Sequence, residues 1–310
     1  MIQTPLNRRE ALKTAALGVL TLPLLHLGAF GADAAKGKKG KTKGEPAASP
    51  TLYPPSSPDG RENGLRIGVA SYSLRALPLD EAITTVQALR VKNIALFRAH
   101  CNWEAASVEE CRAIGAKLNA AGLTLTGSGV VNLSNDETKA RQAFENVRAA
   151  GMQTMVCKPE LAALPLVEKL AKEYDQKLAI HNHGPEDKIY PTPDVIWNAV
   201  KSLDSRVGLC VDVGHTARFG DDPKAAIKKY AARVYDVHMK DSVAVIGAQR
   251  DVPVEVGAGR LDIRGMLRAL LDIKYNGVVS FEYEKVAGNP AIGLAESVGY
   301  VRGVLAAFAK

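Results

Sequence analysis

Short apolar runs alternate with longer amphipathic segments from residue 65 to the end of the chain. The short runs are rich in aliphatic residues, which is typical of parallel strands covered on both faces. They lie at residues 65–73, 93–100, 123–131, 153–158, 177–183, 206–215, 233–241 and 277–285. In the longer segments apolar residues recur at helical spacing, and several begin at Asp or Thr and end at Gly, as capped helices do. These predicted helices lie at 79–90, 107–122, 136–151, 164–174, 192–203, 222–231, 261–273 and 290–310.

This pattern amounts to eight strand-then-helix units in about 245 residues, the number and size expected of a (β/α)8 TIM barrel. An open doubly wound sheet is the main alternative. However, no GxGxxG follows the first strand, and eight units favour a closed sheet. We therefore predict an α/β fold with a TIM-barrel domain over residues 65–310.

The N-terminal segment has a different character. Residues 1–34 combine Arg8 and Arg9, a short apolar stretch and the small-residue sequence Ala32-Asp33-Ala34. These features predict a cleaved twin-arginine signal peptide and hence a periplasmic or secreted protein. An uncleaved membrane anchor is the alternative. Residues 35–64, rich in Lys, Gly, Pro and Ser, predict a flexible linker.

The net charge and the cysteine spacing exclude some partners and sites but identify none. Residues 1–62 hold nine Lys/Arg and five Asp/Glu, a net of +4, which leaves +3 of the total +7 for the rest. We therefore expect no nucleic-acid partner. No segment after residue 35 looks apolar enough to span a membrane. The four cysteines (Cys101, Cys111, Cys157 and Cys210) have no metal-binding spacing, and their spacing predicts no disulfide pair.

The polar side chains capable of chemistry gather at the predicted strand ends, where TIM barrels place their active sites. Every histidine except His26 falls there. The residues, in strand order, are Arg98, His100, Lys158, Glu160, His181, His183, Glu186, Asp212, His215, His238, Lys240, Asp241, Glu282 and Glu284. Because a scattered set of structural histidines would not cluster in this way, the pattern favours a functional site.

Imidazole nitrogens and carboxylate oxygens that converge on one barrel mouth are suitable ligands for a divalent metal. The best set takes one residue from each of strands five to eight: His181, Asp212, His238 and Glu282. These strands are neighbours in the predicted wall, so their tips can meet at one ion. A metal-free acid/base site that uses the same groups is the alternative.

Five motifs in order carry a family resemblance over residues 65–310. They are IHNHGPE, VDVGHTA, VHMKD, GAGRLD and FEYE. With them the chain resembles the sugar phosphate isomerase/epimerase superfamily, the xylose isomerase-like TIM barrels, and within it the members that carry HNH. The superfamily includes ketose epimerases, inosose and dehydroshikimate dehydratases and DNA-repair endonucleases.

The resemblance implies one divalent metal held by Glu, Asp, His and Glu from strands five to eight. Carried over by position, these residues are His181, Asp212, His238 and Glu282. Because His181 stands where many members have glutamate, Glu186 or His183 could serve instead. A second imidazole would favour Mn, Fe, Co or Zn over Mg.

The remaining candidates are interpreted as catalytic or substrate-binding residues. Lys240 shares a strand face with His238 and can polarise a substrate oxygen or form an ion pair with a carboxylate. Candidate catalytic residues are Glu282, Lys240, Glu284, Lys158 and Glu160. Candidate substrate-binding residues are His183, His215, His100, Trp103 and Arg98, with Trp103 as a sugar-stacking wall. The backbone of Gly257-Ala258-Gly259 could present N–H groups to an anion.

Three classes of function follow from this resemblance and this site. The first is an isomerase or epimerase that abstracts a proton next to a carbonyl, and we place it slightly ahead. The second is a lyase that uses the same enolate to expel a leaving group. The third is a non-catalytic sugar-binding barrel or a nuclease, and export and the nearly balanced charge disfavour the nuclease. Export also favours an unphosphorylated or oxidised sugar as the substrate.

Overall fold

The computed structural model describes residues 57–243 and 252–309. The predicted signal peptide (1–34) and most of the predicted linker lie outside these ranges. The last residues of that linker are part of the folded domain, because β1 (Arg61–Glu62) pairs antiparallel with the start of β2 (Leu65–Ala70). The domain therefore begins before residue 65.

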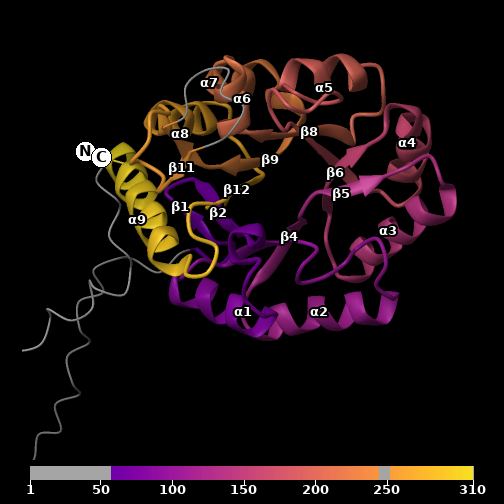
Figure 1. Cartoon of the computed structure of the whole chain (residues 1–310), viewed down its shortest axis with the longest axis horizontal. Coiled ribbons are helices and arrows are strands. Elements are labelled where there is room, and N and C mark those ends of the chain that lie inside the picture. The colour runs from indigo at the N-terminus through magenta and orange to yellow at the C-terminus, as the bar shows by residue number, and fades with distance from the viewer. Residues whose placement is uncertain (1–56, 244–251, 310) are drawn as a thin grey trace, which may run out of the picture. The chain divides into compact units, whose positions relative to one another are not determined.

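The parallel strands form a nearly closed barrel (Figure 1). Going round the wall, they follow the order β4-β3-β2-β12-β9-β8-β7-β6-β5, and the last strand of the chain, β12, pairs with β2. Their bounds are β3 (Asn93–Leu96), β4 (Thr124–Ser128), β5 (Val131–Leu133), β6 (Thr154–Pro159), β7 (Lys177–His181), β8 (Val207–Asp212), β9 (Val234–Met239) and β12 (Val278–Phe281). The predicted TIM barrel is confirmed.

The third strand of the barrel is broken into β4, which pairs with β3, and β5, which pairs with β6. At the break the buried Ser128 side chain bridges the gap. Its Oγ accepts a hydrogen bond from the N–H of Val156 and donates one to the carbonyl of Val156, both at 3.0 Å. A side chain thus supplies backbone pairing where the ladder is interrupted.

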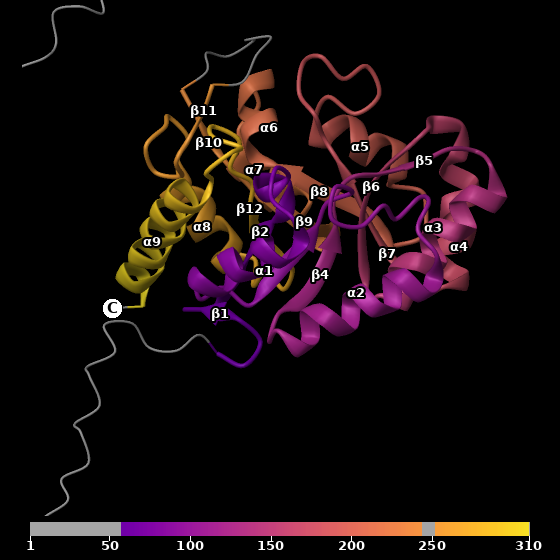
Figure 2. The same ribbon diagram turned by 60° about the horizontal axis from the view of Figure 1, so that its bottom comes forward.

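The helices pack around the outside of the strands (Figures 1 and 2). Their bounds are α1 (Leu79–Ala88), α2 (Val108–Ala120), α3 (Glu137–Ala149), α4 (Leu164–Glu173), α5 (Pro193–Val200), α6 (Val213–Phe219), α7 (Pro223–Lys229), α8 (Ile263–Asp272) and α9 (Ala291–Phe308). Three short 3₁₀ helices cover Ser71–Leu74, Leu161–Ala163 and Ala231–Arg233, and β10 (Asp241–Ser242) pairs with β11 (Pro253–Val254). The predicted Asp and Thr caps form at α3, α5 and α7, where Asp136, Thr192 and Asp222 accept hydrogen bonds from backbone N–H groups of the first turn.

Helix α6 is the one α-helix in the described residues that the pattern did not predict, because 206–215 was interpreted as a single strand. The chain becomes helical directly after β8, since the Asp212 side chain accepts a hydrogen bond from the backbone N–H of His215 at 2.8 Å and caps α6.

Helix α9 is long and apolar enough, by length and composition, to cross a membrane, with a mean hydropathy of 1.3. The expectation that no later segment would reach this level was therefore wrong. A helix that packs on a barrel can pass the same test. Leu294, Val298, Val301 and Leu305 of α9 are buried in the core of the domain.

Candidate metal centre

Four neighbouring strands, β7, β8, β9 and β12, bring the predicted ligand set together at their carboxyl ends. His181 ends β7, Asp212 ends β8, His238 lies in β9, and Glu282 follows β12. One ligand atom from each lies within 4.8 Å of the others. Burial of these four side chains, with at most 9% exposed, makes the cluster part of the barrel interior.

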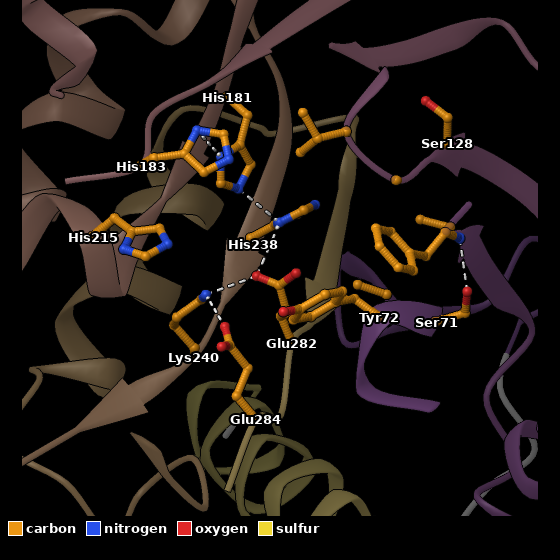
Figure 3. A pocket seen from close by; sticks show the side chains of 15 residues that line it. Ser71, Tyr72, Ser128, His181, His183, His215, His238, Lys240, Glu282 and Glu284 are labelled. Carbon is orange, nitrogen blue, oxygen red and sulfur yellow. Dashed lines mark hydrogen bonds and ion pairs between the residues drawn. The ribbon is translucent and has the colours of Figure 1, made fainter. Parts of the chain in front are cut away.

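The ligand atoms face one another directly (Figure 3). His181 Nε2 lies 3.0 Å from His238 Nδ1 and 3.4 Å from Asp212 Oδ2. His238 Nδ1 lies 3.3 Å from Glu282 Oε2. The other ring nitrogen of His238, Nε2, lies 3.8 Å from the buried Asp236 Oδ1. His238 therefore presents Nδ1 to the cluster and has a carboxylate behind it.

The two carboxylate oxygens of Asp212 have different surroundings. Oδ1 caps α6, whereas the buried Oδ2 makes no well-aligned hydrogen bond among the described residues and is approached by Lys240 Nζ at 3.0 Å and His181 Nε2 at 3.4 Å. Asn182, the middle residue of the HNH motif, fixes the backbone of Asp212, accepting from its N–H at 3.0 Å and donating to its carbonyl at 3.3 Å. This arrangement directs Oδ2 into the cluster.

Lys240 extends its buried ammonium group into the same cluster. Its Nζ lies 3.0 Å from Asp212 Oδ2, 2.7 Å from Glu282 Oε2 and 2.5 Å from Glu284 Oε1. Burial opposes the charged form of Lys240, but the three carboxylates hold its pKa well above the usual value. In this structure Lys240 is therefore the ion-pair partner of the carboxylates.

The set has the chemistry of a divalent metal site. Two imidazoles and two carboxylates suit Mn, Fe, Co or Zn, and the buried Asp212 Oδ2, which makes no well-aligned hydrogen bond, is the kind of atom that an ion satisfies. Burial and the neighbouring imidazoles keep the pKa of His181 well below its usual value, so His181 is neutral, as a ligand must be. Cys210 also lies near the two imidazoles, but burial raises the pKa of its thiol to about 12, which makes it a poor ligand.

Lys240 competes with such an ion, because both require Asp212 Oδ2 and Glu282 Oε2. The site fits a metal on the condition that the ammonium group gives up these two oxygens. Glu284, which Lys240 also contacts, offers it a remaining partner.

A cavity of about 300 Å³ opens over the cluster. Facing the cluster across it, Tyr72 and Phe97 pack edge to face, with ring centroids 4.8 Å apart at 85°. Sequence reasoning missed this apolar wall. The available signal was that each aromatic residue directly follows a predicted strand core.

Two further histidines line the cavity, His183 and His215. His183 Nδ1 lies 3.2 Å from Asp187 Oδ2, and Lys158 Nζ lies 2.6 Å from the same oxygen. Lys158 thus acts on the cavity only through Asp187. Burial lowers the pKa of His215 to about 4, and Arg218 contacts its Nδ1 at 3.0 Å, so this imidazole is neutral.

Of the three strand-five ligand candidates, the structure brings His181 into the cluster. Glu186 instead pairs with Arg218 through both carboxylate oxygens, at 2.5 and 2.8 Å. His183 lies beside His181, with ring centroids 4.4 Å apart, as strand alternation predicted, but outside the four-residue set.

Several predicted site residues lie elsewhere. Trp103 is 1% exposed and donates to the carbonyl of Leu96 at 2.8 Å, so it packs in the core and forms no stacking wall. His100 is buried, and its ring nitrogens contact Ser71 Oγ and the Leu77 carbonyl. The cavity is also not lined by Arg98, which is exposed, or by Glu160, which lines a separate cavity together with Lys158.

The glycines of the GAGRLD motif donate hydrogen bonds to a carboxylate of the chain itself. The backbone N–H groups of Gly257 and Gly259 both donate to Asp241 Oδ2 at 3.0 Å. The interpretation of this loop as an anion site is therefore corrected, since a buried carboxylate of the chain itself occupies its donors.

Comparisons with known proteins agree with this architecture. Residues 162–303 match the profile of the family described as xylose isomerase-like TIM barrel. The inosose dehydratase of Clostridium tetani is 30% identical over 138 residues, 39% of this chain and 46% of that protein. The match thus spans less than half the length of this curated relative.

Two solved structures show the same fold across most of the chain. A crystal structure of the IOLI protein with a bound zinc atom has a TM-score of 0.65 at 15% identity, covering 78% of this chain and 98% of that one. The 3-keto-D-glucoside 4-epimerase of E. coli has a TM-score of 0.62 at 15% identity, covering 77% and 99%. The domain thus has the TIM-barrel fold of these structures, and residues 162–303 are similar to the xylose isomerase-like TIM barrel family.

Proposed function

We propose that the protein is a metal-dependent lyase that eliminates water, or another β leaving group, from a keto-sugar or keto-inositol. The sequence alone put an isomerase or epimerase slightly ahead. The relation to inosose dehydratases supports the lyase alternative.

The observation that carries this proposal is the separation of acid and base groups around the cavity (Figure 3). Glu284 contacts Lys240 at one end of the ligand cluster, whereas the imidazole of His183 lies beside His181 at the other end. A two-base epimerase requires a proton-accepting group on each face of the substrate. An elimination requires one base and one acid, which is the division found here.

Glu284 is the proposed base. Burial raises its pKa, which makes its carboxylate a stronger base, although Lys240 opposes part of this shift. The 2.5 Å contact with Lys240 Nζ fixes the position of the carboxylate at the cavity wall. In the reaction Glu284 removes the proton from the carbon next to the carbonyl, while Lys240 stays within reach of the developing negative charge.

A divalent ion held by His181, Asp212, His238 and Glu282 would polarise the substrate carbonyl as a Lewis acid. His181 would then have no free lone pair with which to accept a proton. Strand β7 therefore supplies no base at the position of His181.

His183 is the proposed acid that protonates the leaving hydroxyl. Asp187 orients its ring through Nδ1, which leaves Nε2 for the substrate. The neutral His215 can hold a substrate hydroxyl. A cavity of about 300 Å³ lies at the small end for ligand sites and suits one sugar-sized ring, with Tyr72 and Phe97 against its carbon face.

The test is to incubate the metal-loaded protein in heavy water with a panel of inososes and 3-keto-glucosides. Elimination gives an unsaturated ketone that absorbs in the ultraviolet and has lost water or the aglycone. Glu284→Gln should lower this rate by roughly 100-fold or more, the usual contribution of a general base. Glu160→Gln, the matched control in a separate cavity, should leave it unchanged.

Deuterium in an isomeric product without elimination would replace the proposal with an isomerase. Tight binding of these sugars without turnover, with metal present, would favour a sugar-binding barrel.

We also propose that the chain is exported by the twin-arginine route, on the basis of Arg8, Arg9 and the apolar stretch after them. A folded export route suits a metalloprotein that acquires its ion before crossing the membrane. Changing both arginines to lysine should retain the protein in the cytoplasm on cell fractionation, and unchanged periplasmic delivery would exclude this route.

A further inference from the structure

Two of the four cysteines lie against each other beside the barrel mouth. Cys101 follows β3 in the loop before α2, and Cys111 lies within α2. Although ten positions apart, their Sγ atoms are 3.8 Å from each other, and both side chains are buried. A disulfide needs the sulfurs at about 2.05 Å, so an approach of roughly 1.8 Å would suffice.

The pair is reachable from one side. Cys101 borders a surface cavity together with His100, Asn102 and Glu110, whereas Cys111 is fully buried and does not line it. The hydrogen bond between the sulfurs raises the pKa of Cys101 and lowers that of Cys111. Accessibility therefore makes Cys101 the sulfur that an oxidant meets first, and the lowered pKa of Cys111 suits it to attack the mixed disulfide that results.

We propose that Cys101 and Cys111 form an intramolecular disulfide when the protein is in an oxidising compartment, and that Cys157 and Cys210 remain thiols.

The oxidant is a small or protein disulfide, such as oxidised glutathione. Cys101 loses its proton to the solvent, attacks that disulfide and releases one thiol, and the Cys111 thiolate then attacks Cys101 Sγ and releases the second thiol. Two protons and two electrons thus leave the cysteine pair, and the disulfide of the reagent is reduced to two thiols.

The other two cysteines cannot form the same bond. Cys157 lies in β6 and Cys210 in β8, and β7 pairs with both of these strands. Two strand spacings amount to roughly 9.6 Å, beyond the separation of about 7 Å that a disulfide can bridge.

A Cys101–Cys111 disulfide would restrain the segment after β3, which supports the apolar wall of the main cavity. Next to Cys101, His100 Nδ1 lies 2.9 Å from Ser71 Oγ, and that hydroxyl accepts from the Phe97 N–H at 2.7 Å. Closing the loop to α2 would therefore restrain the chain that carries Phe97. This bond does not depend on the reaction proposed for the site.

The test uses the full-length protein incubated with excess oxidised glutathione and then digested with trypsin without reductant. Both cysteines fall in one tryptic peptide, residues 99–112. We expect that peptide to be lighter by two hydrogens and to resist alkylation until it is reduced, whereas Cys157 and Cys210 are alkylated after unfolding.

Thermal unfolding of two cysteine variants tests the same bond without the need to recover the peptide. Cys157→Ser should still form the bond and should unfold at a lower temperature after reduction, as the unchanged protein should. Cys101→Ser should show no such dependence on reductant. A 99–112 peptide that carries two alkylated thiols or two glutathione adducts after oxidation would overturn the proposal, and so would a bridge to Cys157 or Cys210.

Discussion

Replacing Lys240 with methionine should destabilise the metal-free protein strongly, because it removes the cation from three carboxylates. Lys240 Nζ lies within 3.0 Å of Asp212, Glu282 and Glu284 and is almost completely buried. Methionine keeps much of the side-chain volume, so the main effect is electrostatic. Removing one partner from a buried ion pair costs about 3–5 kcal/mol.

The lower end of this range is the better expectation. Glu284 already has a raised pKa, so it can take up a proton when the ammonium is lost and relieve part of the repulsion. At about 2–4 °C per kcal/mol for a domain of this size, a loss of roughly 3 kcal/mol lowers Tm by on the order of 10 °C.

Thermal unfolding of protein stripped of metal with a chelator measures the effect, and the measurement is repeated with excess Zn²⁺ or Mn²⁺. The ion should stabilise Lys240→Met more than the unchanged protein, because it no longer competes with the ammonium for Asp212 Oδ2 and Glu282 Oε2. Lys285→Met is the control: its ammonium is half exposed, pairs with Glu255 at 2.8 Å, and should cost at most about 1 kcal/mol. Equal stability of Lys240→Met and the unchanged protein without metal would show that Lys240 does not stabilise the three carboxylates.

Five other substitutions test the same site and the residues beside it. His181→Ala and His238→Ala should each abolish stoichiometric metal binding, as measured by elemental analysis, whereas His183→Ala should retain the metal. Loss of metal only from His183→Ala would identify a different strand-five ligand. Asp236→Asn should weaken metal binding by roughly 10–100-fold in a competition titration, because the carboxylate behind His238 Nε2 no longer orients the ring; unchanged affinity would exclude that role. Burial opposes the ionisation of Asp187, but His183 and Lys158 hold the pKa of this carboxyl below its usual value. The charge of Asp187 therefore stabilises the fold above the unfolded pKa of about 3.9, and this contribution is lost as the pH falls below that value. Urea unfolding should accordingly show Asp187→Asn to be less stable than the unchanged protein at neutral pH and closer to it near pH 3; a pH-independent difference would contradict this.

The barrel and its ligand cluster could be predicted from sequence because both follow from chain order. Periodic apolar runs identify the strands, and parallel strands that are consecutive in the wall bring their carboxyl ends together. His181, Asp212, His238 and Glu282 each sit at such an end on neighbouring strands, so their convergence needed no knowledge of loop conformations. Helix α6 was missed because Val211 and Val213 continue the strand pattern, and only the side-chain cap by Asp212 breaks it.

The rest of the cavity could not be predicted, because residues just beyond a strand can point to either side. Trp103 follows β3 in a loop that turns back, and its indole N–H is satisfied by the Leu96 carbonyl in the core. Phe97, closer to the strand, reaches the cavity instead. Lys158 lies near the end of β6 and Glu160 directly follows this strand, which is not among those that carry the cluster, and both residues line a different cavity.

The proposed function depends on one divalent ion bound by the four side chains at the ends of β7, β8, β9 and β12. Anomalous diffraction from a crystal of the zinc- or manganese-loaded protein tests this most directly. We predict one strong peak within about 2.0–2.3 Å of His181 Nε2, Asp212 Oδ2, His238 Nδ1 and Glu282 Oε2, with Lys240 moved away from the two carboxylates. A loaded crystal with no peak there, in which Lys240 Nζ still contacts Asp212 and Glu282, would contradict the account.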